Sequence, residues 1–316
     1  MDRYFVVRRC CGMSSPSLAV KLCGIEFSNP VIAASGTFGS VKDYKKYIDI
    51  NKLGGIAAKG VTLEPRKGNP PPRIVETPSG ILNSVGLQNL GVDYFIEQEL
   101  PLLLDYKTRI IVNINGNTID EYCLVAEKLK NKKIDMLELN ISCPNVKAGG
   151  ASFGAHPEMV YKVTKAVKAV STQPLIVKLT PNTTDIKETA AAAEEAGCDA
   201  ISLINTILGM AIDIKTRRPI LGNVVGGLSG PAIKPIALRM VWETAHSVKI
   251  PIIGMGGIIT WEDAVEFLLA GATCISVGTG NLMDPSTCIN ILEGLTHYMA
   301  DCGISSVTEL IGGLSI

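Results

Sequence analysis

A cysteine placed among amide side chains is the first feature of this sequence that could do chemistry. The stretch LELNISCPNV, residues 137–146, begins as an apolar run, passes Asn140 and Ser142, and then presents Cys143. A free cysteine is most often a small buried core residue, and the position alone leaves that interpretation open. A thiol at the end of a strand could also act as a base or nucleophile, provided that it can lose its proton. Whether Cys143 is a core residue or a reactive thiol depends on the secondary-structure elements that position it.

Apolar runs along the whole chain carry lysine, asparagine or glycine near their ends. Eight such runs, each followed by a turn and a helix-like segment, cover residues 30–36, 55–64, 109–116, 136–144, 174–182, 200–206, 251–258 and 273–280. The stretches between them carry apolar residues three and four positions apart, which is typical of amphipathic helices. Eight β-then-α units with near-continuous apolar strands predict a (β/α)8 TIM barrel of the α/β class. An open, doubly wound sheet is the alternative.

The segment before the first barrel strand has a different pattern. LAVKLCGIEFSN alternates around Cys23 and Gly24, which predicts a β-hairpin at the barrel floor. We expect residues 1–15 to form a loose N-terminal extension and residues 16–316 to form a single barrel domain, since neither a solenoid repeat nor a low-complexity linker interrupts them.

The bulk composition argues against several kinds of partner. Lysine plus arginine and aspartate plus glutamate both total 30, and aromatic residues make up 5% of the chain, so we expect no nucleic acid. The nine cysteines include no C-x-x-C pair, which predicts neither a zinc nor an iron–sulfur site, and scattered thiols suit a reducing compartment. No apolar signal-peptide core or unbroken apolar span is present. We therefore expect a cytoplasmic protein without a membrane span.

The ends of the predicted strands define a candidate site, because in such barrels the chemistry lies where the strands end. These ends hold Ser35-Gly36, Lys59-Gly60, Asn113, Asn140 to Cys143, Lys178, Asn205-Thr206, Gly256-Gly257 and Gly278-Thr279. By contrast, Cys198 and Cys274 lie at strand starts, and Cys123 and Cys288 lie in helix-like segments, where packing is the expected role.

The glycines after the last two strands occupy the place where barrels of this kind commonly bind a phosphate. Neither GMGGII nor GTGNLM completes G-x-G-x-x-G, so the sequence encodes no Rossmann nicotinamide site. A flavin mononucleotide (FMN) across the barrel mouth fits this pattern, with Lys178 stabilising the reduced ring. Phosphosugar isomerases and aldolases, with Lys59 or Lys178 as the Schiff-base lysine, stay open as alternatives.

Six segments of the chain together resemble the class 1 dihydroorotate dehydrogenases, in the same order from Leu18 to the C-terminus. They are ASGTFG, KGVTLEPRKGNPPPRIVETPSGILNSVGLQN, NISCPNV, VKLTPN, INT and GGLSGPAIKPIALRMV. LQN at 87–89 and TLEPRKGNPPPR are similar to the NAD-linked 1B branch, whereas the membrane-bound class 2 enzymes have serine at the base position. The N-terminal extension, with Cys10 and Cys11, departs from the family pattern.

The resemblance implies an enzyme that oxidises dihydroorotate to orotate in pyrimidine (UMP) synthesis. It implies that Cys143 is the base that removes a proton from C5 of dihydroorotate while C6 passes hydride to N5 of FMN. It assigns the cofactor to Ser35, Lys59, Gly60, Asn113, Asn140, Lys178, Ile204, Gly230, Gly256, Gly257, Gly278 and Thr279. It assigns the substrate to Lys59, Asn83, Ser84, Val85, Gly86, Leu87, Asn140, Asn205 and Thr206, with Asn145 as a candidate of lower weight.

The 1B resemblance also implies partners. Two copies of this chain would form a homodimer within a heterotetramer, each docked to an electron-transfer subunit that carries FAD and a [2Fe–2S] cluster and delivers electrons to NAD. The alternatives are a fumarate-linked 1A enzyme, a dihydropyrimidine dehydrogenase-like flavoenzyme and, from another class, a flavin-free phosphosugar lyase. The glycine-rich segment after Cys143 predicts an active-site lid, with a plain surface loop as the alternative.

Overall fold

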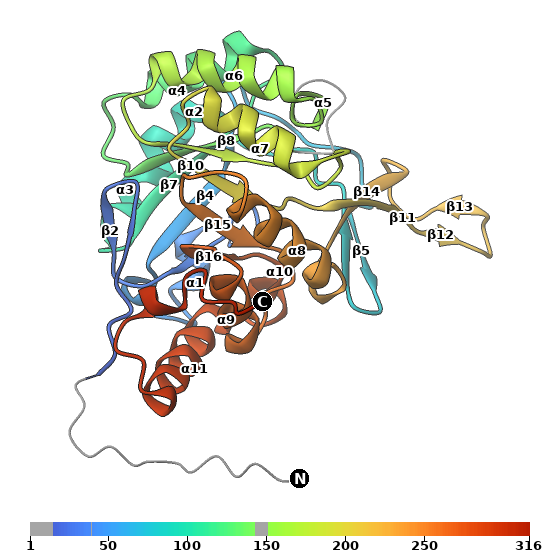
Figure 1. Cartoon of the computed structure of the whole chain (residues 1–316). Coiled ribbons are helices and arrows are strands. Elements are labelled where there is room, and N and C mark those ends of the chain that lie inside the picture. The colour runs from blue at the N-terminus through green and yellow to red at the C-terminus, as the bar shows by residue number, and fades with distance from the viewer. Residues whose placement is uncertain (1–14, 39, 143–150) are drawn as a thin grey trace.

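A computed structural model of the chain describes residues 15–38, 40–142 and 151–316, without the side chains of 151 and 152. Its centre is a closed barrel of parallel strands in the order β10-β15-β16-β3-β4-β7-β8-β9 (Figure 1). These strands are β3 (Val31–Ala33), β4 (Gly55–Val61), β7 (Arg109–Ile114), β8 (Met136–Asn140), β9 (Leu175–Lys178), β10 (Ala200–Leu203), β15 (Ile252–Met255) and β16 (Cys274–Val277). The TIM barrel prediction and all eight predicted strands are confirmed, and the open-sheet alternative is wrong.

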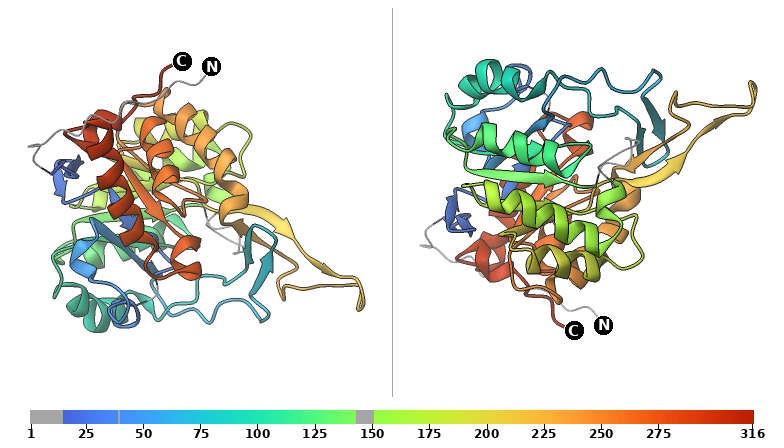
Figure 2. Two further views of the ribbon diagram at one scale, coloured as in Figure 1. Left: turned by 90° about the horizontal axis from the view of Figure 1, so that it is seen from below. Right: turned by 90° about the horizontal axis from the view of Figure 1, so that it is seen from above.

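Helices cover the outside of the barrel (Figures 1 and 2). The longer ones are α4 (Ile119–Leu129), α6 (Pro157–Val170), α7 (Ile186–Glu195), α8 (Lys234–Ala245), α9 (Trp261–Leu269) and α11 (Thr287–Cys302). Shorter ones are α1 (Val41–Tyr44), α2 (Gly91–Tyr94), α3 (Leu100–Leu103), α5 (Ala151–Gly154), α10 (Thr279–Met283), the π-helical η2 (Phe95–Glu99) and the 3-10 turns η1 (Ile50–Lys52), η3 (Pro231–Ile233) and η4 (Val307–Leu310). Side chains of Thr118, Asp185 and Thr260 cap α4, α7 and α9.

The N-terminal hairpin closes the barrel floor. Strands β1 (Val20–Leu22) and β2 (Ile25–Phe27) pair antiparallel around a turn in which Cys23 and Gly24 both have positive φ. The Cys23 thiol donates to the backbone oxygen of Asp199 at 3.2 Å, and the Arg109 Nε donates to that of Glu26 at 2.7 Å. Because Asp199 and Arg109 stand where β10 and β7 start, the predicted floor position of the hairpin is confirmed.

A second sheet, which the sequence pattern did not predict, lies beyond the carboxyl ends of the barrel strands. It contains β11 (Ile207–Met210), β14 (Val225–Ser229), β6 (Gly80–Asn83) and β5 (Ile74–Thr77), in that order. A small hairpin of β12 (Ile212–Asp213) and β13 (Arg218–Pro219) projects from it, away from the barrel (Figures 1 and 2). The sheet joins the loops after β4 and β10 over one side of the mouth.

Two expectations fall on parts of the chain outside this description. The predicted loose extension over residues 1–15 lies outside the described residues except for position 15, and the domain limits remain a prediction. Most of the glycine-rich segment after Cys143 lies outside them as well, although its later part forms α5. Within the described part of the chain, no helix is both long and apolar enough to span a membrane.

Candidate active site

The barrel mouth holds a cavity of about 340 Å³ between the strand ends and the second sheet. All the predicted cofactor and substrate residues line it except Ser84, and so does Gly36 from the predicted strand ends. The sequence interpretation did not assign a role to the other lining residues, which are Ala34, Thr37, Ile74, Ile81, Gln88, Ser229, Ile233, Met255 and Leu282. Cys143 and Asn145 lie outside the described residues. The structure therefore brings nearly the whole predicted set into one space, while the role of each residue remains a prediction.

Glycine backbone forms the cavity wall at the carboxyl ends of the last two barrel strands, β15 and β16. Gly256 and Gly257 have φ of 126° and 79°, a region that L-residues rarely adopt. A Cβ on Gly257 would stand 2.7 Å from the Cβ of Lys234, and one on Gly256 would stand 2.6 Å from the Cβ of Ala237. No side chain fits at either position, so the bare backbone faces the cavity beside Thr279, the first residue of α10. Such backbone suits a phosphate group.

Two lysines bring positive charge to the mouth. Lys178, at the end of β9, is 6% exposed, and its Nζ lies 3.6 Å from the carboxylate of Glu138. Lys59, on β4, is partly buried, and its ammonium group has neither an ion pair nor a hydrogen bond within the described part of the chain. Burial raises the pKa of Glu99, in η2, and the Lys59 charge opposes that shift. An unpaired lysine at the cavity can receive an anionic group of a ligand.

Hydrogen bonds fix the orientation of the predicted amides. Asn140 donates to Asn113 Oδ1 at 3.2 Å, and its own Oδ1 accepts from the backbone and hydroxyl of Ser142 at 3.2 and 2.8 Å. The Ser142 hydroxyl in turn accepts from Asn205 Nδ2 at 2.8 Å, and Asn205 Oδ1 accepts from the Thr206 N–H at 2.8 Å. These side chains therefore present defined donors and acceptors just before position 143.

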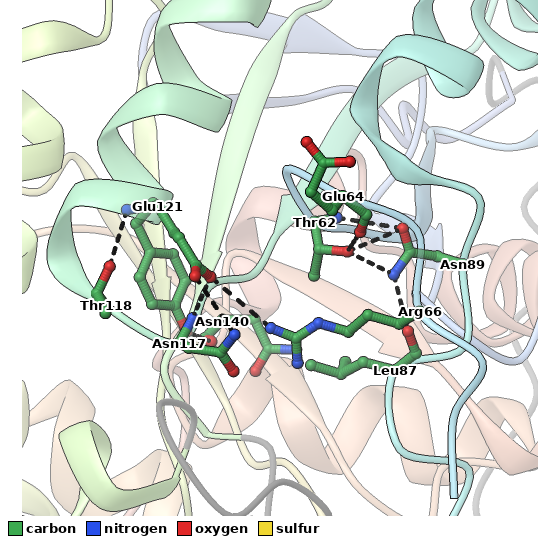
Figure 3. Close-up of polar contacts among 10 residues, drawn as sticks. Thr62, Glu64, Arg66, Leu87, Asn89, Asn117, Thr118, Glu121 and Asn140 are labelled. Atoms are coloured by element: carbon green, nitrogen blue, oxygen red, sulfur yellow. Dashed lines mark hydrogen bonds and ion pairs between the residues drawn. The ribbon is translucent and has the colours of Figure 1, made fainter.

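The segment Asn83 to Leu87 is held against the cavity by a buried asparagine. Asn89 Oδ1 accepts from the backbone N–H of Thr62, and its Nδ2 donates to the Leu87 carbonyl at 2.8 Å (Figure 3). The same Oδ1 also accepts from the backbone N–H of Gly91. Leu87 has φ of 57°, and its neighbour Gly86 has φ of 75°. Asn89 is the last residue of LQN, so this motif has a physical task, which is to hold the cavity-lining backbone in the left-handed region.

Arginines brace the same segment from outside. Arg73 donates to the backbone oxygens of Asn69 and Lys67 and to the side chain of Gln88, at 2.5, 2.9 and 2.7 Å. Arg66 extends from the loop after β4 toward Glu121 of α4, with 3.9 Å between the charged atoms (Figure 3). The TLEPRKGNPPPR segment thus ties β4, α4 and the Asn83–Leu87 segment into one wall.

Four of the described thiols are unsuited to acid–base chemistry. Burial raises the pKa of Cys23 and of Cys288 to about 12, and it raises the pKa of Cys198 and Cys274 further. None of these four lines the cavity, and Cys123 lies in α4 on the outside of the barrel. The positions predicted to serve packing are confirmed for Cys198, Cys274 and Cys288, which are buried.

The cavity has features that fit a flavin and a polar ring compound. The hydroxyl oxygen of Thr206, which lines the cavity, and that of Ser84, whose chain neighbours Asn83 and Val85 line it, have no hydrogen-bond partner within the described part of the chain. A Cβ on Gly36 would meet nothing within 4 Å, so the backbone there borders open space. Orphaned polar atoms, two cations and a glycine wall match the needs of an anionic, hydrogen-bonding ligand beside a phosphate-bearing cofactor.

Comparisons with known proteins point to one family. A family model for dihydroorotate dehydrogenase matches residues 17–299. The dihydroorotate dehydrogenase B (NAD(+)) catalytic subunit of Alkaliphilus metalliredigens (strain QYMF) is 59% identical over 302 residues, which cover 96% of this chain and 100% of that protein. The protein of the same name from Thermoanaerobacter sp. (strain X514) is 55% identical over 300 residues, covering 95% and 99%. A crystal structure of DHODH from Eimeria tenella in complex with ferulenol has a TM-score of 0.78 at 24% identity, covers 94% of this chain and 88% of that chain, and is alike in fold.

Proposed function

The chain belongs to the dihydroorotate dehydrogenase family, and from this premise we propose that it is the catalytic subunit of an NAD-linked class 1B enzyme. It oxidises dihydroorotate to orotate in pyrimidine synthesis. The observation that carries this proposal is the single cavity at the barrel mouth, in which a buried lysine, an unpaired lysine and a set of hydrogen-bonded amides meet a glycine wall.

The substrate side of the cavity orients dihydroorotate. Its ring edge alternates donors and acceptors, and an asparagine offers both from one side chain. Asn83, Asn140 and Asn205 therefore match the ring, and the unsatisfied hydroxyl of Thr206, which also lines the cavity, supplies a further group. Lys59, which has no ion pair within the described residues, is placed to attract the substrate carboxylate.

Cys143 follows Ser142 at the end of β8, next to these amides in the sequence. We assign it the removal of the C5 proton by its thiolate, while the C6 hydrogen leaves as hydride and the C5–C6 double bond forms. A bound FMN supplies the hydride acceptor. Lys178 holds a positive charge at the cavity wall, where negative charge collects during the reaction. The thiol must deprotonate to act, so the rate rises with pH through the thiol range.

The cofactor would lie across the glycine wall. We place its phosphate at Gly230, Gly256, Gly257, Gly278 and Thr279, and its ring near Ser35, Lys59, Gly60, Asn113, Asn140, Lys178 and Ile204. Support comes from their common position in the cavity and from the φ values that only glycine adopts easily at Gly256 and Gly257.

Electrons then have to reach NAD. The two relatives described above carry the name of an NAD-linked catalytic subunit, which supports a separate electron-transfer subunit for this chain too. We propose that this subunit carries FAD and a [2Fe–2S] cluster, and that two copies of it bind a homodimer of this chain to form a heterotetramer in the cytoplasm. The chain itself has no G-x-G-x-x-G after a strand and no C-x-x-C pair.

One set of anaerobic assays separates the possible functions. The purified chain should contain FMN, and dihydroorotate should reduce that flavin while dihydrouracil does not. With dihydroorotate, the isolated chain should reduce artificial dyes but not NAD, and NAD reduction should appear when the partner subunit is added. Rapid NAD reduction by the chain alone would contradict the partner proposal, and rapid fumarate reduction would place the chain in the 1A branch. Reduction by dihydrouracil in preference to dihydroorotate, or absence of flavin, would contradict the proposed activity.

A further inference from the structure

Glu138 is a buried carboxylate inside the barrel that neither the sequence pattern nor the family comparison singles out. It lies on β8, two residues before Asn140, so both side chains lie on the same face of the strand. Its exposure is 3%, and its Oε1 accepts from the hydroxyl of Ser202, on a strand that is not its neighbour, at 2.8 Å. Strand β9 lies between β8, which carries Glu138, and β10, which carries Ser202, so these two side chains can meet only in the barrel interior. Glu138 therefore lies inside the barrel, beneath the cavity.

The second carboxylate oxygen of Glu138 faces two predicted cofactor residues. Its Oε2 accepts from Asn113 Nδ2 at 2.5 Å, and Lys178 Nζ lies 3.6 Å away. The strand register places Asn113 beside Glu138 and Lys178 beside Asn140. One carboxylate thus touches both the cation and the first amide of the cavity floor.

A carboxylate can only accept hydrogen bonds, and this fixes the direction of the whole amide chain. Because Asn113 turns its NH2 to Glu138, its Oδ1 must face Asn140 and Asn115, and both donate to it, at 3.2 and 2.9 Å. Asn140 must then turn its Oδ1 to Ser142, whose hydroxyl accepts from Asn205. The charge at one end therefore sets which group each amide presents at the other.

Packing alone does not explain a charge at this position. The interior layers of such barrels are usually filled by branched apolar side chains, and a buried ion pair often adds little stability over apolar residues of the same volume. What the carboxylate uniquely does here is hold the lysine ammonium and orient the amides.

We propose that Glu138 is a positioning residue for the flavin and the substrate. It holds Lys178 at the cavity wall, lowers the net positive charge that the flavin ring meets, and fixes the donor and acceptor sense of Asn113, Asn140 and Asn205. The inference rests on the proposed function for the identity of the ligands, but its charge effect applies to any bound flavin.

The test compares charge variants of the flavin-loaded full chain. Glu138→Gln removes the negative charge, so the midpoint potential of the flavin should rise, and sulfite, which binds flavins more tightly near positive charge, should bind more tightly. Lys178→Met should shift both readouts the opposite way, and the double variant should return toward wild type. Orotate should bind at least tenfold more weakly to Glu138→Gln and to the double variant, because a glutamine can reverse the amide chain. Glu138→Asp, which keeps the charge, should retain more of the orotate affinity.

A second ion pair, at the barrel floor and less buried than that of Glu138 and Lys178, supplies the control. Asp199 pairs with Lys168, and its carboxylate also accepts from the Leu175 N–H. Asp199→Asn should lower stability without changing the flavin potential or sulfite affinity. An unchanged potential and unchanged orotate affinity in Glu138→Gln would overturn the proposal. If that variant does not fold, wild-type orotate affinity in the double variant would overturn it. Failure of dihydroorotate to reduce the flavin of the wild-type chain would instead contradict the proposed function. The flavin potential and the sulfite affinity would still test the role of Glu138.

Discussion

Replacing Asn89 with alanine should weaken orotate binding by about tenfold while leaving the flavin bound. The Asn89 side chain is 8% exposed and satisfies three backbone groups, the N–H groups of Thr62 and Gly91 and the carbonyl of Leu87. Alanine leaves all three without these partners, at about 1–3 kcal/mol for each buried group that water does not reach. We expect the free energy of unfolding to fall by about 3 kcal/mol, since water can satisfy some of them. Leu87, no longer held at φ of 57°, should then shift with the rest of the wall that faces the substrate.

Asn29 provides a matched control at the other end of the barrel. Its Oδ1 accepts from the N–H groups of Val31 and Gly54, both at 3.1 Å, and its Nδ2 donates to the Lys52 carbonyl at 2.8 Å. Asn29→Ala therefore breaks the same kinds of bond at a similar burial of 6%, but far from the cavity. Urea unfolding should give comparable losses of stability for the two variants, and orotate titration of the flavin spectrum should weaken only for Asn89→Ala. Equal orotate affinity in Asn89→Ala and Asn29→Ala would refute the idea that Asn89 positions the substrate wall.

Three further predictions concern single groups. Cys143→Ala should slow flavin reduction by dihydroorotate in stopped flow by about 10³-fold, and Cys143→Ser should keep part of the rate; near-wild-type reduction by Cys143→Ala would remove this thiol from the mechanism. Iodoacetamide at mildly alkaline pH should leave Cys23 and Cys288 unmodified, since burial raises the pKa of both to about 12; peptide mass spectrometry checks this, and labelling as fast as that of the exposed Cys302 would contradict it. Burial raises the pKa of Asp263, but hydrogen bonds from Lys234 and two backbone N–H groups outweigh it and hold that pKa below its ordinary value. The stabilisation is therefore present at neutral pH and lost as the pH falls below about 4. The difference in free energy of unfolding between wild type and Asp263→Asn, measured in urea, should disappear at that pH. A difference that persists in acid would contradict the assignment.

The barrel itself could be predicted because its signals are local. Each strand is a short apolar run followed by a turn and an amphipathic helix, and Thr118, Asp185 and Thr260 announce helix starts within a few residues. The strand ends of a parallel barrel share one face, so Lys178, Asn140 and their counterparts had to meet at the mouth. Most of the site follows from that rule together with the family resemblance.

The second sheet could not be predicted from the same kind of signal. Its central pairing places Leu82 opposite Leu228, and β14 contains Gly226 and Gly227, a residue type that disfavours strands. The side-chain oxygen of Thr206 would stand 1.9 Å from a Cβ on Gly227, so that glycine is required by close packing and not by strand propensity. Such pairing depends on how two long loops meet above the barrel, which no window of sequence records.

The roles of Glu138 and Asn89 could be inferred from the sequence only in part. The alternation of LELN indicates that Glu138 shares a face with Asn140, so a buried acid beneath the site could have been inferred from the strand period. Its contacts with Asn113 and Lys178 depend on the register of three neighbouring strands, which only the fold supplies. LQN marked a family branch, while the bonds from Asn89 to Thr62 and Leu87 appear only in three dimensions.

We expect dihydroorotate to reduce a flavin bound in the barrel-mouth cavity while Cys143 accepts the proton. The most direct measurement mixes the flavin-loaded chain with dihydroorotate in the absence of oxygen and follows the visible absorbance of oxidised flavin, for wild type and for Cys143→Ala at matched flavin content. The wild-type flavin should bleach rapidly, with a rate that rises with pH through the thiol range, and the flavin of the variant should bleach slowly and nearly independently of pH. A wild-type flavin that stays oxidised, or equal rates and pH profiles in the two proteins, would contradict it.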